Sequence, residues 1–147
     1  MLRLIAPQSI PGFFANAGQA AVERALVQTL PDTGRVHVCI LALGDADDQA
    51  QLAEYCRPHL RDARVSIVPF DPSLPADLLA GYDGLILHGL SPFPTVRRWL
   101  RRARATRRLP VVQHIHSLFL VEFELRLYAQ LWAGWQGWPP AAWVVPT

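Results

Sequence analysis

Two apolar runs that each end at a histidine constrain the fold of this chain more than any other feature. The first spans residues 82–90 and the second spans residues 110–117. Runs of Val, Ile and Leu of this length, polar only near their end, are typical of parallel strands buried on both faces. In open α/β sheets, ligands bind just beyond the carboxyl ends of such strands. The two runs therefore predict a binding edge at which imidazole side chains gather.

Strand-like and helix-like segments alternate along the whole chain. Strands are expected at 2–6, 36–43, 65–70, 83–88, 110–116 and 141–145, and helices at 18–30, 45–59, 76–80, 95–108 and 118–132. This alternation predicts βαβ units and a Rossmann-like α/β fold, in which a mostly parallel sheet of about six strands carries helices on both faces. Residues 1–147 are expected to form a single domain, because no linker divides them.

The helical segments are expected to bury apolar stripes against this sheet. In the 18–30 segment the stripe consists of Ala21, Val22, Ala25, Leu26 and Thr29. The 45–59 helix is expected to turn Leu52, Tyr55 and Cys56 inward. The 7–17 segment is expected to be a loop, because it contains prolines and glycine.

The charges of the chain are segregated along the sequence. Seven arginines and no acidic residue lie in 95–109, whereas the other seven arginines share the rest of the chain with 12 acidic residues. On the predicted 95–108 helix one stripe carries Arg97, Arg101, Arg104 and Arg108, and the opposing apolar stripe carries Val96, Trp99, Leu100 and Ala103. Like charges one helical turn apart repel each other, so an anionic partner would stabilise this helix.

An anionic membrane surface is the partner expected for the basic helix, at roughly 1 kcal/mol per cation near such a surface. Nucleic acid is a weaker expectation, because the segment has neither a recognition-helix pattern nor interleaved aromatic residues. The alternative interpretation is the solvated outer face of a packed helix.

The histidines at the strand ends are the candidate catalytic and binding residues. His116 could donate a hydrogen bond to a substrate hydroxyl or stabilise a developing charge, since the pKa of an imidazole lies near neutrality. His114 is expected on the same face of the strand as His116. His88, Gly89 and Ser117 are expected to line the same edge, and a structural strand-end histidine is the alternative. No metal site is predicted, because no further ligand stands at a suitable spacing.

The loop before the 18–30 helix contains no Gly-x-Gly-x-x-Gly or Walker-type motif. The helix that begins at Gly18 would nevertheless direct backbone N–H groups toward the ligand edge, where they can hold a phosphate. The alternative is that Gly18 only permits close packing. The two cysteines, Cys39 and Cys56, form neither a disulfide framework nor a metal motif, which favours a reducing cytoplasm. The start lacks the features of a signal peptide, and no run reaches the ~18 apolar residues of a membrane span.

Five segments in order resemble the N-terminal Rossmann-like domain of GT-B glycosyltransferases, above all the retaining glycosyltransferase family 4. The resemblance covers essentially the whole chain and rests on residues 2–6, 16–21, 82–90, 110–117 and 142–147. It implies an acceptor-side domain whose donor-binding C-terminal domain lies beyond Thr147, in the same gene or in a separate chain. The acceptor would be a glycan or a lipid-linked glycan, and attachment to the inner face of the membrane would be peripheral.

The resemblance also assigns roles to individual residues. His116 matches the strand-end histidine that would contact the transferred sugar. Gly18 matches the second of two glycines near the donor phosphates, with Asn16 close by, and Ala17 replaces the first glycine. The first loop has no histidine that could act as the base of an inverting enzyme, which favours retention. The domain alone is expected to bind no cofactor and to transfer no sugar, since the nucleotide-sugar donor would bind in the complete enzyme.

Two other classes of protein remain open. The first is a flavodoxin-like or receiver-like module that binds a partner protein. Receiver chemistry needs acidic residues at strand ends, and here only Asp45, Asp47 and Asp48 cluster after a predicted strand. The second is a nucleotide-binding α/β protein of unrelated function.

Overall fold

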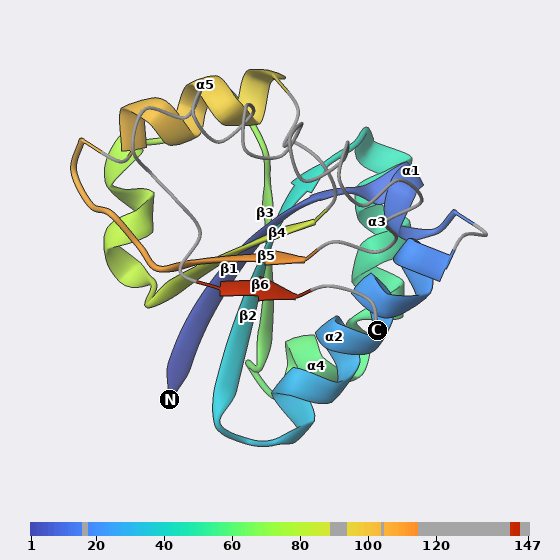
Figure 1. The fold of residues 1–147 in the computed structure, drawn as a ribbon. Helices are drawn as coiled ribbons and strands as arrows, with labels where there is room; N and C mark the ends of the chain where they lie inside the picture. Colours follow the sequence, from blue (N-terminus) through green and yellow to red (C-terminus); the bar gives the residue numbers. More distant parts are fainter. Residues whose placement is uncertain (16–17, 89–93, 104, 115–141, 145–147) are drawn as a thin grey trace, which may run out of the picture.

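A parallel sheet of six strands forms the centre of the molecule (Figure 1). The computed structural model describes residues 1–15, 18–88, 94–103, 105–114 and 142–144. The strands are β1 (Leu2–Ser9), β2 (Val36–Leu43), β3 (Val65–Pro69), β4 (Gly84–His88), β5 (Val111–His114) and β6 (Ala142–Val144). They lie in the order β3-β2-β1-β4-β5-β6, and each neighbouring pair is parallel. The predicted Rossmann-like α/β fold is confirmed.

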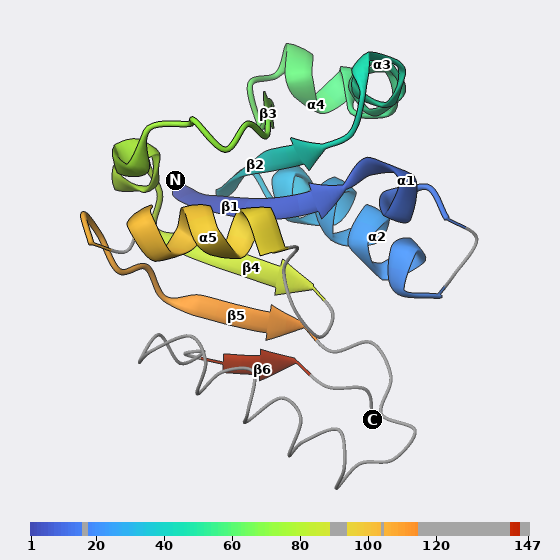
Figure 2. The same ribbon diagram turned by 90° about the horizontal axis from the view of Figure 1, so that it is seen from above.

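The helices cover the two faces of the sheet in two groups, which Figure 2 shows from above. One face carries α1 (Ile10–Phe13), α2 (Gly18–Asp32), α3 (Ala46–Tyr55) and α4 (Arg57–Arg61). The other carries the 3-10 helix η1 (Ala76–Gly81) and α5 (Pro94–Ala103). Right-handed crossovers explain this division. The connections from β1 to β2 and from β2 to β3 run in one direction along the sheet, whereas those from β3 to β4 and from β4 to β5 run in the opposite direction. The helices of the two sets of connections therefore lie on opposite faces.

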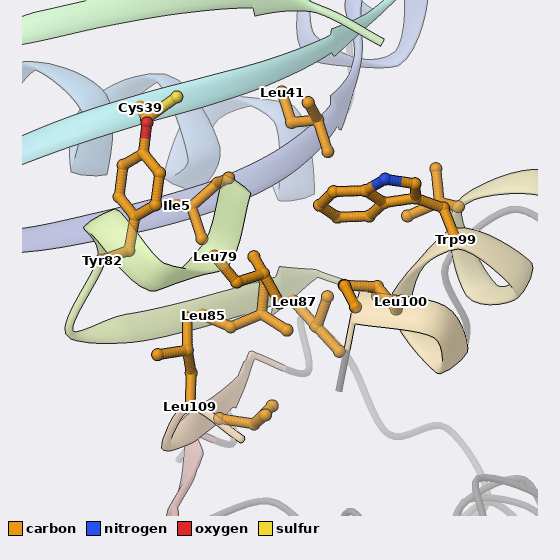
Figure 3. Packing of buried hydrophobic residues seen from close by; sticks show 13 residues of the cluster. Ile5, Cys39, Leu41, Leu79, Tyr82, Leu85, Leu87, Trp99, Leu100 and Leu109 are labelled. Atoms are coloured by element: carbon orange, nitrogen blue, oxygen red, sulfur yellow. The ribbon is translucent and has the colours of Figure 1, made fainter. Parts of the chain in front are cut away.

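Each face has its own apolar core. On the α5 face, Trp99 and Leu100 pack with Leu79, Leu85 and Leu87, and all five are at least 98 % buried (Figure 3). On the α2 and α3 face, the core contains Ile10, Phe13, Val27, Val38, Ile40 and Leu52. A sheet that is covered on both sides in this way explains why its central strands are continuous apolar runs.

Hydrogen bonds fix α5 to the segment 71–81. The Trp99 indole donates to the carbonyl of Leu74 at 2.9 Å, and the Thr106 hydroxyl donates to the carbonyl of Ala76 at 3.0 Å. The guanidinium of Arg102 donates to the carbonyl of Pro72, and that of Arg107 donates to the carbonyl of Ala80. Two arginines of the basic segment therefore have a structural role that the sequence pattern did not indicate.

Strand β1 is longer than predicted and continues through Pro7 to Ser9. The N–H of Leu2 donates to Arg35 on the β2 side, so by alternation the nitrogen of Pro7 faces β4. The pairing of β1 with β4 ends at Ile5–Leu85, whereas its pairing with β2 continues to Ser9–Leu43. The missing proline N–H therefore falls where β1 has no pairing with β4, so Pro7 does not end the strand.

Several helix boundaries differ from the predictions. The predicted loop 7–17 contains α1, whose N-cap Ser9 accepts a hydrogen bond from the backbone of Gly12. The single helix predicted over 45–59 is divided into α3 and α4, with Pro58 in the first turn of α4, where a proline is tolerated. The basic helix, predicted over 95–108, begins at Pro94 and ends at Ala103, so Arg108 lies beyond it.

The buried stripe of α2 also differs from the predicted one. Ala21, Ala25 and Thr29 are exposed, whereas Ala20, Glu23 and Val27 are buried. The helix is therefore rotated so that a carboxylate faces inward, which apolar periodicity alone does not predict. The inward positions of Leu52, Tyr55 and Cys56, and the strand at 142–144, agree with expectation. The predicted helix 118–132 lies outside the described residues.

Candidate functional site

The candidate site lies at the carboxyl edge of the sheet, between β1 and β4. The strand order reverses at this point, which is where open α/β sheets bind their ligands. Beyond Ile5 and Leu85 the two strands no longer pair. The residues that follow on β1 are Pro7, Gln8 and Ser9, and β4 ends at His88.

Two of the predicted site residues come together at this edge. His88 and His114 are the last residues of β4 and β5, and they are register partners in the parallel pair. Adjacent strands thus deliver two histidines to the same end of the sheet, as the apolar runs predicted. Gly18, the third predicted residue in the described part of the chain, is the first residue of α2.

Five of the predicted site residues cannot be placed. Asn16, Gly89, His116, Ser117 and Arg104 lie outside the described residues. The proposed contact of His116 with a transferred sugar therefore stays a prediction. Of the predicted cationic stripe, Arg97 is half-buried, and Arg101 and Arg108 are exposed.

Gln8 is a candidate site residue that the sequence analysis missed. Its side chain is at the carboxyl end of β1 and is 4 % exposed, and its Nε2 has no hydrogen-bond partner among the described residues. A buried donor without a partner destabilises a fold by about 1–3 kcal/mol, so such groups concentrate where a ligand or a functional constraint explains them. In the sequence, Gln8 follows the apolar run 2–6 and Pro7. Because Pro7 was expected to end the strand, Gln8 was assigned to a loop.

Glu23 is the second polar residue that the sequence analysis missed. It lies in the second turn of α2 and is 6 % exposed. Because the helix runs back from the carboxyl edge, its buried stripe proceeds from Ala20 through Glu23 to Val27. Glu23 is therefore nearer to the candidate edge than Val27, which packs in the core with Val38.

The N-termini of α2 and α3 differ in what they offer an anion. The first turn of α3 is closed by a capping box, in which the backbone of Asp48 donates to the Asp45 carboxylate at 2.9 Å and the backbone of Asp45 donates to Asp48 at 3.1 Å. The first turn of α2 contains no acidic residue. Only the α2 terminus of these two therefore suits a negatively charged ligand.

A separate polar cluster lies at the amino end of the sheet, on the α5 face. The Tyr82 hydroxyl lies against the Cys39 thiol (Figure 3), and burial together with this contact raises the pKa of Tyr82 to about 12. The Arg3 guanidinium lies 5.1 Å from the centre of the Tyr82 ring. Burial, and then the charge of Arg3, lower the pKa of His37, whose Nδ1 has no hydrogen-bond partner.

The environment of His37 predicts a loss of stability in mild acid. The unfolded chain binds a proton at His37 near the ordinary pKa of 6.5, whereas the folded chain binds it only at lower pH. Below pH 6.5 the unfolded state therefore carries more protons, and the free energy of unfolding falls as the pH drops toward the folded-state pKa. H37Q is expected to remove this part of the pH dependence in urea titrations, and H59Q is expected to retain it. An H37Q protein with an unchanged pH dependence would contradict this.

An apolar cavity of about 490 Å³ lies between α2 and the sheet. Its lining includes Val22, Leu26 and Leu30 of α2 and Leu4, Ile86 and Val112 of the strands. Gly84 and Pro110 place it toward the amino end of β4 and β5, away from His88 and His114. It therefore does not belong to the candidate site.

No group of three or more His, Cys, Asp or Glu side chains in the described ranges could hold a metal ion. No described helix has the length and apolarity needed to cross a membrane.

The fold and the position of the site define an open, Rossmann-type α/β protein with a binding edge at the β1–β4 switch point. No family model matches the chain, and no curated protein sequence matches it.

Proposed function

We propose that this chain is the acceptor-binding half of a retaining glycosyltransferase of the GT-B type. In the complete enzyme, a second α/β domain would supply most of the nucleotide-sugar site, and the sugar would pass to a glycan or lipid-linked acceptor. The observation that carries the proposal is the polar carboxyl edge of an otherwise apolar sheet, where His88 and His114 end β4 and β5 and Gln8 is the second-last residue of β1.

The chemistry of these groups suits a hydroxyl-rich ligand. An imidazole can accept or donate a hydrogen bond to a sugar hydroxyl, and a buried amide N–H₂ needs an acceptor oxygen. The N-terminus of α2 adds backbone N–H groups that favour a phosphate at the same edge. His116 would contact the transferred sugar, and Asn16 and Gly18 would lie near the donor phosphates.

The receiver-like alternative has less support. Asp45 and Asp48 follow β2, but both carboxylates serve the capping box of α3. The strands β1 and β4 end in Ser9 and His88 rather than in acidic residues. A receiver site would need carboxylates at these ends.

The proposal predicts which amides a ligand will perturb. The isotopically labelled chain is titrated with short oligosaccharides as acceptor analogues, alone and in the presence of UDP-glucose or GDP-mannose, while its amide spectrum is recorded. Shifts are expected at residues 8, 9, 18, 88 and 114, at the carboxyl edge, with no sugar transfer by the chain alone. Shifts confined to residues 3, 37 and 82 at the amino end, or robust transfer by this chain, would refute the proposal.

A further inference from the structure

The outward side of α5 carries several arginines. The apolar side of the helix, formed by Val96, Trp99, Leu100 and Ala103, is buried against the sheet. Arg98 and Arg101 are exposed, and the half-buried Arg97 flanks them. Arg108 is exposed just beyond the end of the helix. We call these four residues the α5 arginine face.

Several other arginines in the described part of the chain have protein partners. Arg57 forms an ion pair with Glu54, and Arg64 lies 3.2 Å from Asp62 and 3.6 Å from Asp32. Arg102 and Arg107 of the basic segment donate to backbone carbonyls of Pro72 and Ala80. By contrast, Arg97, Arg98 and Arg108 have neither an ion-pair partner nor a hydrogen-bond acceptor among the described residues.

Hydrogen bonds fix the backbone that carries the α5 arginine face. Arg102, Arg107 and the Trp99 indole hold α5 to the 71–81 segment, so the outward guanidinium groups start from a fixed backbone. Fixed like charges close together repel one another, and a guanidinium group binds phosphate oxygens in a two-pronged geometry. A surface with many phosphate groups would relieve the repulsion at little cost in conformational entropy.

We propose that the α5 arginine face binds the phosphate headgroups of an anionic lipid bilayer. The apolar side of α5 belongs to the core, so the contact is adsorption to the headgroups without insertion of the helix. A bilayer suits this surface better than a nucleic acid does, because the aromatic side chain of α5, Trp99, is buried and cannot stack on bases. The nearest acidic residue in sequence is Asp83, which precedes β4, and Asp71 and Asp77 lie on the neighbouring 71–81 segment.

The position of α5 relates this surface to the candidate site. The helix begins at Pro94, shortly after β4 ends at His88, so its first turn lies at the carboxyl edge of the sheet. A bilayer bound to the α5 arginine face would therefore lie next to the carboxyl edge of the sheet. The proposal does not depend on the reaction that the edge serves, since it rests on the charges and partners of α5 alone.

Vesicle co-sedimentation of the full chain tests the proposal. The vesicles are phosphatidylcholine alone, or equal parts of phosphatidylcholine and phosphatidylglycerol. The chain is expected to bind the anionic vesicles only, and binding is expected to fall as salt screens the charges. The variant R97Q/R98Q/R108Q is expected to lose about 100-fold in partition coefficient, which corresponds to ~1 kcal/mol per cation.

A matched variant separates the α5 arginine face from net charge. R35Q/R57Q/R61Q removes the same number of charges from exposed positions elsewhere and is expected to retain most of the binding. Urea unfolding of both variants checks that each is folded. The proposal is overturned if both variants lose binding equally, if neutral vesicles bind as well as anionic ones, or if the chain binds polyuridylic acid but no vesicle.

Discussion

Replacing Trp99 with alanine is expected to lower the free energy of unfolding by about 3–5 kcal/mol. The indole is 1 % exposed and is the largest fully buried side chain of the described residues. It packs edge-on against Phe70, with ring centres 6.2 Å apart, and its Nε1 donates to Leu74. The substitution therefore opens a cavity in the α5 core and removes one contact between α5 and the 71–81 segment. Urea titration of the folded chain measures the loss.

A conservative variant distinguishes packing from the hydrogen bond. W99F retains an aromatic ring in the core but cannot donate to Leu74, so it is expected to lose less than half as much stability as W99A. Equal losses in the two variants would show that the hydrogen bond, rather than the volume, dominates. A loss below about 1 kcal/mol in W99A would contradict the described packing, because truncation of a fully buried tryptophan exceeds that value.

Replacing Gln8 with methionine is expected to stabilise the chain and weaken its ligand binding. Methionine has a similar length and no polar atom, so the variant removes the unpartnered Nε2 while filling the same space. The expected gain is about 1–3 kcal/mol in the free energy of unfolding, the usual cost of a buried polar group without a partner. The same change removes a hydrogen-bond donor from the proposed ligand edge. The changes in amide chemical shift that ligand binding causes at residues 9, 88 and 114 should therefore become smaller.

Gln49 provides the matched control for this experiment. Its Oε1 also has no partner, but its Nε2 donates to the carbonyl of Ala42 at 3.1 Å. Q49M therefore loses a hydrogen bond as well as an unpartnered atom, and its stability is expected to stay the same or to fall by about 1 kcal/mol. If Q8M destabilises the chain as much as Q49M does, then the Gln8 side chain stabilises the fold, and its Nε2 is not a donor reserved for a ligand.

The sheet and its binding edge were predictable because they depend on long apolar runs. The runs 82–90 and 110–117 predict adjacent parallel strands, and the register pairs His88 with His114. The rule that consecutive βαβ units share a sheet then places both histidines at one edge. The glycosyltransferase resemblance adds function to this geometry, and that part remains a proposal.

Other features depend on tertiary contacts that a local pattern does not contain. Strand β1 was expected to stop at Pro7, but a proline is tolerated at a position where β1 no longer pairs with β4. The buried side of α2 was misassigned because the helix turns Glu23 inward. Gln8 was missed because the strand was expected to stop at Pro7. Arg102 and Arg107 were counted as surface cations, although their acceptors lie 27 to 30 residues away in sequence.

The outermost strands of the sheet bear on how this chain behaves at high concentration. β3 is five residues long and ends in Pro69, and β6 at the opposite side is three residues long. Short edges, and a proline that cannot donate to an incoming strand, are the devices by which sheets resist edge-to-edge aggregation. Within the described residues, neither border thus offers a long template for another molecule to extend, which protects a sheet with so apolar an interior from growing into fibrils.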